Sequence, residues 1–199
     1  MRESKTAESQ KTPRSRLLAD AATLIIAKHG SRGLTHRAVD NATNLPEGST
    51  SNLFRTRADL MSAVLNAHVE RELAIMDSVG AMDSVGTIDE AASLIATVIE
   101  SLASAESLHL TTARYEIYLE GLRQEPFQVL IAQVRTRFLA IGVGLLNDLN
   151  LPSDDYIATG LVSLVEGLTA NQVFHSGAAL NKKDLKALIT AFLNSLKTI

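Results

Sequence analysis

Apolar residues recur at spacings of three and four along almost the whole chain, which is the pattern of amphipathic α-helices. The first such segment carries Leu17, Leu18, Ala21, Leu24 and Ile25. No alternating pattern of useful length competes with it, so the sequence predicts an all-α protein. Helices are predicted over residues 13–29, 35–42, 46–53, 57–76, 88–103, 108–122, 125–149, 154–175 and 182–196.

Several predicted helix ends carry residues that satisfy the free backbone groups found there. Thr56 and Asp59 have the spacing of a capping box, in which each side chain accepts a hydrogen bond from the other residue's N–H. Asn181 and Asp184 have the same spacing before the last helix. Gly30 stands where a residue with positive φ would end the first helix.

A hexapeptide is duplicated near the middle of the chain, as MDSVGA at residues 76–81 and MDSVGT at residues 82–87. A period of six residues is far shorter than that of helical repeat proteins, so the duplication does not indicate a repeat architecture. Its two glycines indicate a connector, and we expect a domain boundary nearby.

The composition excludes several classes of site. The chain has 199 residues and no Cys, which excludes disulfides, iron–sulfur clusters, Cys nucleophiles and thiolate zinc sites. The five His residues form no His-x₃-His pair, and the acidic pairs at predicted helix starts are explained by the helix dipole. We therefore expect no catalytic site, no metal and no cofactor.

Charge is distributed unevenly, although the net charge is only −3. Residues 1–60 contain ten Lys or Arg and six Asp or Glu, whereas residues 61–199 contain nine and sixteen. A basic end often meets a polyanion, although a basic tail without a partner explains the same excess. The first sixteen residues lack the apolar core of a signal peptide, and no apolar run approaches the roughly 20 residues of a membrane span. We therefore expect a cytoplasmic protein.

Residues 34–60 have the dimensions of a helix-turn-helix, in which a tight turn joins two short helices. Asn44 stands at the turn, where a left-handed backbone is needed, and Val39 and Leu45 can lock the helices together. The second helix presents small and polar residues: Pro46, Glu47, Gly48, Ser49, Thr50, Ser51 and Asn52. Such side chains suit insertion into the major groove of DNA, and the alternative is a solvated loop with helical caps.

This stretch resembles the TetR family of one-component transcriptional regulators, whose pattern runs Thr-x-Arg-x-Ile-Ala, Ala-Gly-Val, Gly-x-x-Tyr-x-x-Phe, and then Lys and Leu. The corresponding residues are Thr35, Arg37, Val39, Thr43, Asn44, Leu45, Gly48, Ser51, Phe54, Arg57 and Leu60. Three residues depart from the pattern: Asp40 replaces Ala, Asn44 replaces Gly, and Ser51 replaces an aromatic residue that often contacts a phosphate. The resemblance is specific over residues 13–75 and architectural beyond them.

The resemblance implies a three-helix DNA-binding domain with a basic N-terminal arm in residues 1–60, and a helical ligand-binding and dimerisation domain in residues 61–199. Arg57, Thr35 and Arg37 would grip the phosphate backbone. Four residues would point outward from the third helix toward the bases: Glu47, Ser49, Thr50 and Asn52. The full set of expected DNA contacts is Arg14, Thr35, His36, Arg37, Pro46, Glu47, Gly48, Ser49, Thr50, Ser51, Asn52, Arg55 and Arg57.

The resemblance also implies a homodimer, joined through residues 126–149 and 154–175, that binds a palindromic operator in double-stranded DNA. Polar and aromatic residues within the apolar helices are candidates for an effector pocket: His109, Arg114, Tyr115, Tyr118, Phe138, Asn171 and His175. The sequence thus predicts a ligand-responsive regulator, a repressor that a small molecule releases. The alternatives are an all-α enzyme with an unrecognised site and a helix-turn-helix adaptor that binds protein.

Overall fold

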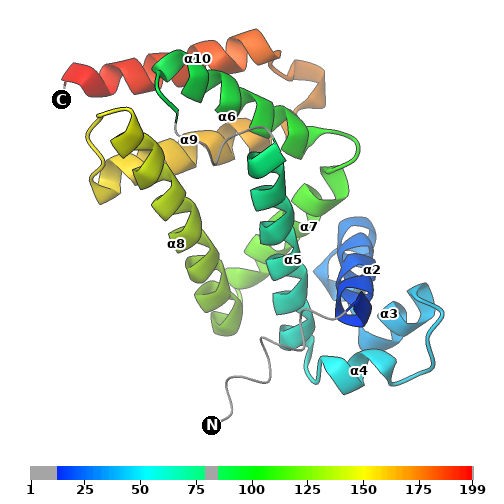
Figure 1. Cartoon of the computed structure of the whole chain (residues 1–199). Helices are drawn as coiled ribbons and strands as arrows, with labels where there is room; N and C mark the ends of the chain where they lie inside the picture. Colours follow the sequence, from blue (N-terminus) through cyan, green and yellow to red (C-terminus); the bar gives the residue numbers. More distant parts are fainter. Residues whose placement is uncertain (1–12, 79–84, 199) are drawn as a thin grey trace. The chain divides into compact units, whose positions relative to one another are not determined.

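The computed structural model describes residues 13–78 and 85–198, and within these ranges it contains helices and no strands (Figure 1). The prediction of an all-α protein is confirmed. The α-helices are α2 (Pro13–His29), α3 (His36–Ala42), α4 (Ser49–Leu53), α5 (Arg57–Ser78), α6 (Ile88–Ala103), α7 (Leu108–Gly121), α8 (Glu125–Asp148), α9 (Asp155–Phe174) and α10 (Lys182–Ser195). Short 3₁₀ helices accompany them: η1 (Ser31–Gly33), η2 (Ser176–Ala178) and η3 (Leu196–Thr198).

The predicted helix ends are confirmed where the capping signal is local. Asp59 N–H donates to Thr56 Oγ1 at 3.0 Å and Thr56 N–H donates to Asp59 Oδ2 at 2.9 Å, so the capping box opens α5. Asp184 N–H donates to Asn181 Oδ1 at 3.0 Å at the start of α10. Gly30 adopts φ +70° directly after α2. Each of these ends depends on residues within four positions of one another.

Helix α4 begins three residues later than predicted, at Ser49 instead of residue 46. Asn44 has φ +53° in the preceding turn, as expected, but Gly48 also has a positive φ of +89°. A left-handed residue interrupts a right-handed helix, so α4 cannot extend back through Gly48. Pro46 and Glu47 therefore belong to an exposed turn.

The helices pack as two units that do not follow the linear order of the chain. One unit comprises Met1–Arg71 and His109–Ile131, and the other comprises Glu72–Leu108 and Ala132–Ile199. Helix α5 runs unbroken through residue 60, and α7 packs with the N-terminal helices. These units describe packing, and the functional division at residue 60 stays a prediction. Residues 79–84 of the hexapeptide duplication lie outside the described residues, so its role as a connector stays a prediction.

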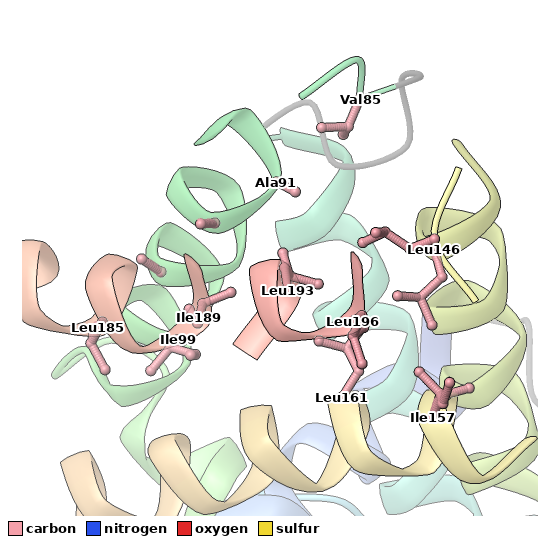
Figure 2. Packing of buried hydrophobic residues seen from close by; sticks show 14 residues of the cluster. Val85, Ala91, Ile99, Leu146, Ile157, Leu161, Leu185, Ile189, Leu193 and Leu196 are labelled. Carbon is pink, nitrogen blue, oxygen red and sulfur yellow. The ribbon is translucent and has the colours of Figure 1, made fainter. Parts of the chain in front are cut away.

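Each unit has its own hydrophobic core. In the second unit, Leu185, Ile189 and Leu193 lie one helical turn apart on α10 and are fully buried (Figure 2). The fully buried Ala92 and Ala96 of α6 belong to the same cluster, and their small side chains allow helices to approach closely. The core of the first unit includes residues from α2, α3 and α5: Leu18, Ile26, Val39, Leu60 and Leu65.

Candidate functional site

The segment from α3 to α4 has the geometry of a helix-turn-helix. Ala38 N–H donates to Thr35 Oγ1 at 3.1 Å, so Thr35 caps α3 as predicted. Leu45 N–H returns to the carbonyl of Asp40 at 3.0 Å and closes the turn that contains Asn44. Two short helices joined by a tight turn are therefore present where the sequence predicted them.

Seven of the expected DNA contacts are exposed to solvent. They are Arg14, Thr35, Arg37, Pro46, Glu47, Asn52 and Arg55. Their exposure makes these residues available to a nucleic acid, and their contact with one stays a prediction. The other expected contacts are buried or partly buried, and several have a structural role.

Ser49 and Thr50 face the interior, so the expectation that they point outward is wrong. Both are buried, and Thr50 is 0% exposed. The hydroxyl of Thr50 donates to Asp40 Oδ1 at 2.5 Å. The side chain of Thr50 is therefore engaged within the protein instead of facing the bases.

His36 and Ser51 are half-buried and also serve the helix-turn-helix itself. His36 Nε2 lies 2.7 Å from the carbonyl oxygen of Phe54, which can only accept, so the imidazole N–H donates. The hydroxyl of Ser51 donates to the carbonyl of Gly48 at 3.1 Å. Both side chains thus satisfy backbone groups of α4 and its ends.

Asp40, 2% exposed, is the residue that holds the start of α4. It accepts the N–H of Gly48 at 2.9 Å and the N–H of Thr50 at 2.7 Å. Burial by itself would raise the pKa of Asp40, but the hydrogen bonds from Thr50 and Gly48, with the charge of His36, outweigh burial and hold the pKa below its ordinary value. From the sequence, Asp40 was only a departure from the family pattern. A charged residue where that pattern has a small apolar one is the signal that could have found this role.

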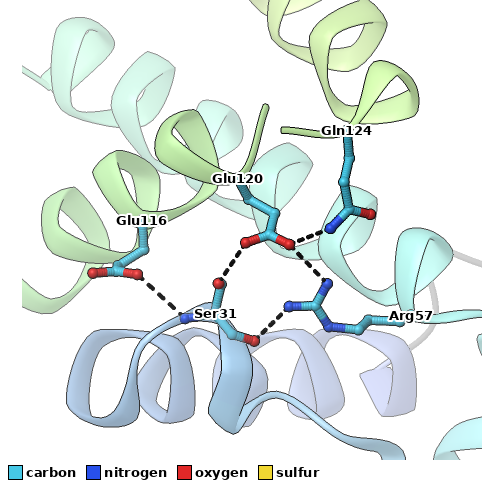
Figure 3. Close-up of polar contacts among 5 residues, drawn as sticks. All are labelled: Ser31, Arg57, Glu116, Glu120 and Gln124. Atoms are coloured by element: carbon cyan, nitrogen blue, oxygen red, sulfur yellow. Dashed lines mark hydrogen bonds and ion pairs between the residues drawn. The ribbon is translucent and has the colours of Figure 1, made fainter. Parts of the chain in front are cut away.

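Arg57 is held by neighbours in its own unit (Figure 3). Its Nη2 donates to the carbonyl of Ser31 at 2.6 Å, and its Nη1 lies 3.4 Å from Glu120 Oε1. The side chain is 35% exposed. A DNA phosphate would have to compete with two protein acceptors, so the grip of Arg57 on phosphate stays a prediction.

Glu120 is the centre of this polar cluster, and sequence reasoning missed it. The hydroxyl of Ser31 donates to Glu120 Oε2 at 2.8 Å, and Gln124 Nε2 donates to Oε1. The hydrogen bond from Ser31, opposed by burial and aided by the charge of Arg57, holds the pKa of Glu120 below its ordinary value. Ser31 and Arg57 are 89 and 63 residues from Glu120 along the chain, so no local sequence pattern could have predicted the cluster.

Three of the expected effector residues lie together on α7. The Cζ of the buried Arg114 is 5.1 Å from the ring centroid of Tyr115 and 5.8 Å from that of Tyr118. The two rings meet edge to face with centroids 6.3 Å apart. His109 is half-buried on the same helix. Cation–π contacts of this kind hold a guanidinium among aromatic rings.

The remaining three effector candidates belong to the other packing unit. Phe138 of α8 and Asn171 of α9 are half-buried, and His175 is exposed at the end of α9. Four of the seven candidates thus lie in one packing unit and three in the other. Sequence reasoning also missed His68 of α5, a polar residue that is buried. Its position between the apolar Leu65 and Val69, both buried, is the feature of the sequence that could have predicted its burial.

The helix pair expected to join two copies carries an exposed apolar surface. Contrary to the expectation from the sequence, helix α8 is long and apolar enough to cross a membrane by length and composition. Only 17% of this apolar stretch is buried. Exposed small residues follow one another at four-residue spacing on it: Ala132, Thr136, Ala140 and Gly144. On α9, Tyr156 and Phe174 are large apolar residues that are also exposed.

A family model described as the tetracyclin repressor-like C-terminal domain matches residues 86–196. Solved structures share the fold over most of the chain. A member of the TetR family from Streptomyces coelicolor A3 is 22% identical, with a TM-score of 0.73 over 91% of this chain and 98% of that chain. A transcriptional regulator from Rhodococcus sp. Rha1 is 16% identical, with a TM-score of 0.73 over 94% and 97%.

A third structure is that of the multidrug binding protein EbrR in complex with ethidium. It is 23% identical, with a TM-score of 0.69 over 92% of this chain and 99% of that chain. At these identities the structures establish a common fold. No curated protein sequence matches the chain.

Proposed function

Because the chain belongs to the TetR family of transcriptional regulators, we propose that it binds DNA through residues 1–60 and carries its dimerisation and effector functions in residues 61–199. It acts as a homodimeric repressor of a palindromic operator in double-stranded DNA, and a small molecule releases it. The observation that supports DNA binding most directly is the α3–α4 helix-turn-helix, which presents Arg37, Glu47 and Asn52 to solvent. Such a regulator works in the cytoplasm.

The exposed side chains suit two kinds of DNA contact. Arg37 and Arg55 suit phosphates, because a guanidinium pairs with phosphate oxygens. Glu47 and Asn52, just before and within α4, suit base edges, because Asn pairs with adenine and Glu accepts from cytosine. Thr35 and Arg14 add backbone contacts. In this assignment α4 enters the major groove and α3 lies across the backbone.

Two copies associate through residues 126–149 and 154–175. The exposed small residues of α8 allow close approach of a second helix, and the apolar surface that the protomer leaves unburied would be covered in the dimer. The symmetric pair would present two copies of α4 about 34–36 Å apart, or a multiple of a helical turn, and this spacing matches a palindrome.

The effector is an apolar small molecule with one or two polar groups, since the candidate residues combine rings with a guanidinium. EbrR, which shares the fold, is a multidrug binding protein with a structure in complex with ethidium. In this chain Arg114, Tyr115 and Tyr118 form the best-defined part of the effector site. His109, Phe138, Asn171 and His175 remain candidates for the rest of it. Effector binding lowers operator affinity by about 5–150-fold if the coupling is of ordinary size.

Selection from a pool of random DNA duplexes is expected to enrich a palindrome. Arg37→Ala should then make the dependence of affinity on salt shallower by about one unit for each lost phosphate contact, because fewer counterions are released. The test is fluorescence anisotropy with the enriched duplex over a range of salt concentrations. Lys183→Ala, at an exposed position on α10, is the matched control and should leave the slope unchanged. If no sequence is enriched, the chain is not an operator-binding regulator, and the adaptor and enzyme alternatives return.

Tyr115→Phe is expected to blunt the response to an effector while leaving effector-free DNA binding nearly intact. The hydroxyl is lost but the ring that faces Arg114 is kept, so the packing of α7 changes little. A thermal-shift screen of small molecules first finds a compound that stabilises the wild-type protein. Operator affinity is then measured with and without that compound, in Tyr115→Phe and in His109→Ala. An unchanged response in both variants would place the effector site elsewhere, and collapse of effector-free DNA binding would make these residues part of the core.

A further inference from the structure

Helix α4 does not cap its own N-terminus. Its N-cap is Gly48, which has no side chain, and the first turn of any helix leaves backbone N–H groups without partners. An N-cap Ser, Thr, Asp or Asn normally accepts one of those N–H groups. Here Asp40 of the preceding helix takes that part. Its Oδ2 accepts the N–H of Gly48 and its Oδ1 accepts the N–H of Thr50.

The other end of α4 is held from the same helix. The carbonyl of Phe54, the C-cap residue after α4, accepts a hydrogen bond from the imidazole of His36. His36 and Asp40 are four residues apart on α3, so they project from one face of that helix. We name these two side chains, with Thr50 as the partner of Asp40, the α3–α4 clamp.

A clamp matters for α4 because this helix cannot hold its own shape. Five residues are far fewer than an isolated helix needs in water, and Gly48 adds backbone freedom directly before it. The positions of Glu47 and Asn52 relative to a base edge therefore depend on what holds α4 to α3. A displacement of the recognition element weakens base readout, whereas phosphate contacts tolerate it because they act mainly through charge.

We infer that the α3–α4 clamp of His36, Asp40 and Thr50 determines DNA sequence specificity by positioning α4, and that Asp40 and Thr50 do so without reading a base themselves. The inference rests on the proposed DNA-binding function and adds residues to it that act from inside the protein. Asp40 and Thr50 are positioning residues, since both side chains are buried and bonded to each other.

Thr50 offers the sharpest test, because two substitutions separate its hydroxyl from its shape. Thr50→Val keeps the branched shape and removes the hydroxyl that donates to Asp40. Thr50→Ser keeps the hydroxyl and removes a methyl group. Asp40→Asn tests the other partner. The NH₂ group of the amide is a donor and would face a backbone N–H, of Gly48 or of Thr50, that the carboxylate accepts. His36→Phe removes the donor at the far end of α4.

The measured quantity is the ratio of affinities for the duplex that wild-type protein enriches and for a scrambled duplex of equal length. Thr50→Val and Asp40→Asn are expected to lower this ratio about tenfold or more, with affinity for the scrambled duplex within about twofold of wild type. Thr50→Ser should keep the wild-type ratio within about twofold. Circular dichroism at the assay temperature confirms that each variant is folded, and a repeated selection with Thr50→Val should yield a more degenerate half-site.

The inference is overturned if folded Thr50→Val and Asp40→Asn keep the wild-type ratio. It is also overturned if Thr50→Ser loses specificity as fully as Thr50→Val, because packing of the methyl group would then account for the effect. Equal losses on both duplexes would assign the clamp to general stability and overturn the specificity claim. If wild-type protein enriches no duplex, the proposed function itself fails, which is distinguishable because no variant is involved.

Discussion

Gly144→Arg is expected to turn the proposed dimer into a monomer and to weaken binding to the enriched palindrome by about 100-fold or more. Gly144 is exposed on α8, and a Cβ placed there would meet no atom within 4 Å, so the protomer itself tolerates a side chain. In the dimer the guanidinium would be buried without a partner, which is strongly unfavourable. A monomer keeps one half-site contact and loses the gain that comes from joining two.

Sedimentation velocity measures the oligomeric state of this variant, and anisotropy measures its affinity for the palindrome. Ala187→Arg is the matched control, because it adds the same charge at an exposed position on α10, away from the proposed interface. Gly160 is a poorer site for the test, since a Cβ there would already contact the Phe192 ring at 3.5 Å, whereas a Cβ at Gly144 meets no atom within 4 Å. A Gly144→Arg dimer that still binds the palindrome tightly would move the interface away from α8.

The helices and most of their ends could be predicted because their causes are local. The capping box of Thr56 and Asp59 and the N-cap of Asn181 each involve residues three positions apart, and the structure forms both. Asn44 was expected to be left-handed and is. Hydrophobic periodicity likewise needs only a window of neighbouring residues. The all-α fold follows from such windows alone.

The interior of the helix-turn-helix could not be predicted in the same way. Thr50 is polar, and a polar residue on a short exposed helix is expected to face solvent. The buried carboxylate of Asp40, on the preceding helix, reverses that expectation. It accepts a hydrogen bond from the Thr50 hydroxyl, so the hydroxyl is satisfied when it faces the interior. The partners are ten residues apart, across the turn, so only the folded geometry shows them together.

Arg57 shows the same limit over a longer distance. At the start of α5, an Arg beside an expected DNA contact surface is naturally assigned to phosphate. In the structure Arg57 contacts Ser31 and Glu120, and Glu120 lies on α7, within the residues 61–199 that the sequence assigns to the second domain. Helix α7 belongs to the first packing unit because of long-range contacts of this kind, which periodicity cannot report.

Glu120→Gln is expected to lower the free energy of unfolding at pH 7 by about 1–3 kcal/mol, because an amide cannot accept from every donor that the carboxylate satisfies. Three side chains donate to this carboxylate: Ser31, Arg57 and Gln124. Glu116→Gln is the matched control one turn earlier on α7, since Glu116 accepts a single N–H, from Ser31, at 3.3 Å. The control should cost about 0.5 kcal/mol or less, as substitutions outside buried networks usually do.

The loss in Glu120→Gln should depend on pH in a defined direction. The pKa of Glu120 is lowered by folding, so its charged form contributes stability above the pKa of an unfolded Glu, about 4.3, and that contribution is lost as pH falls through the folded pKa. The gap in stability between wild type and Glu120→Gln should therefore be constant from about pH 6 to 7 and should narrow as the pH falls below about 4.3, the pKa of an unfolded Glu. Urea denaturation at one protomer concentration across this pH range measures the gap. The contribution of Asp40 to the pH dependence cancels in the difference, because both proteins contain Asp40. A gap that stays constant down to acid unfolding would mean that the charge of Glu120 contributes nothing to stability.

Glu120→Gln should also weaken the effect of an effector on operator affinity. The Glu120 carboxylate connects α7, the helix of Arg114 and Tyr118, to Ser31 and Arg57 beside the DNA-binding helices.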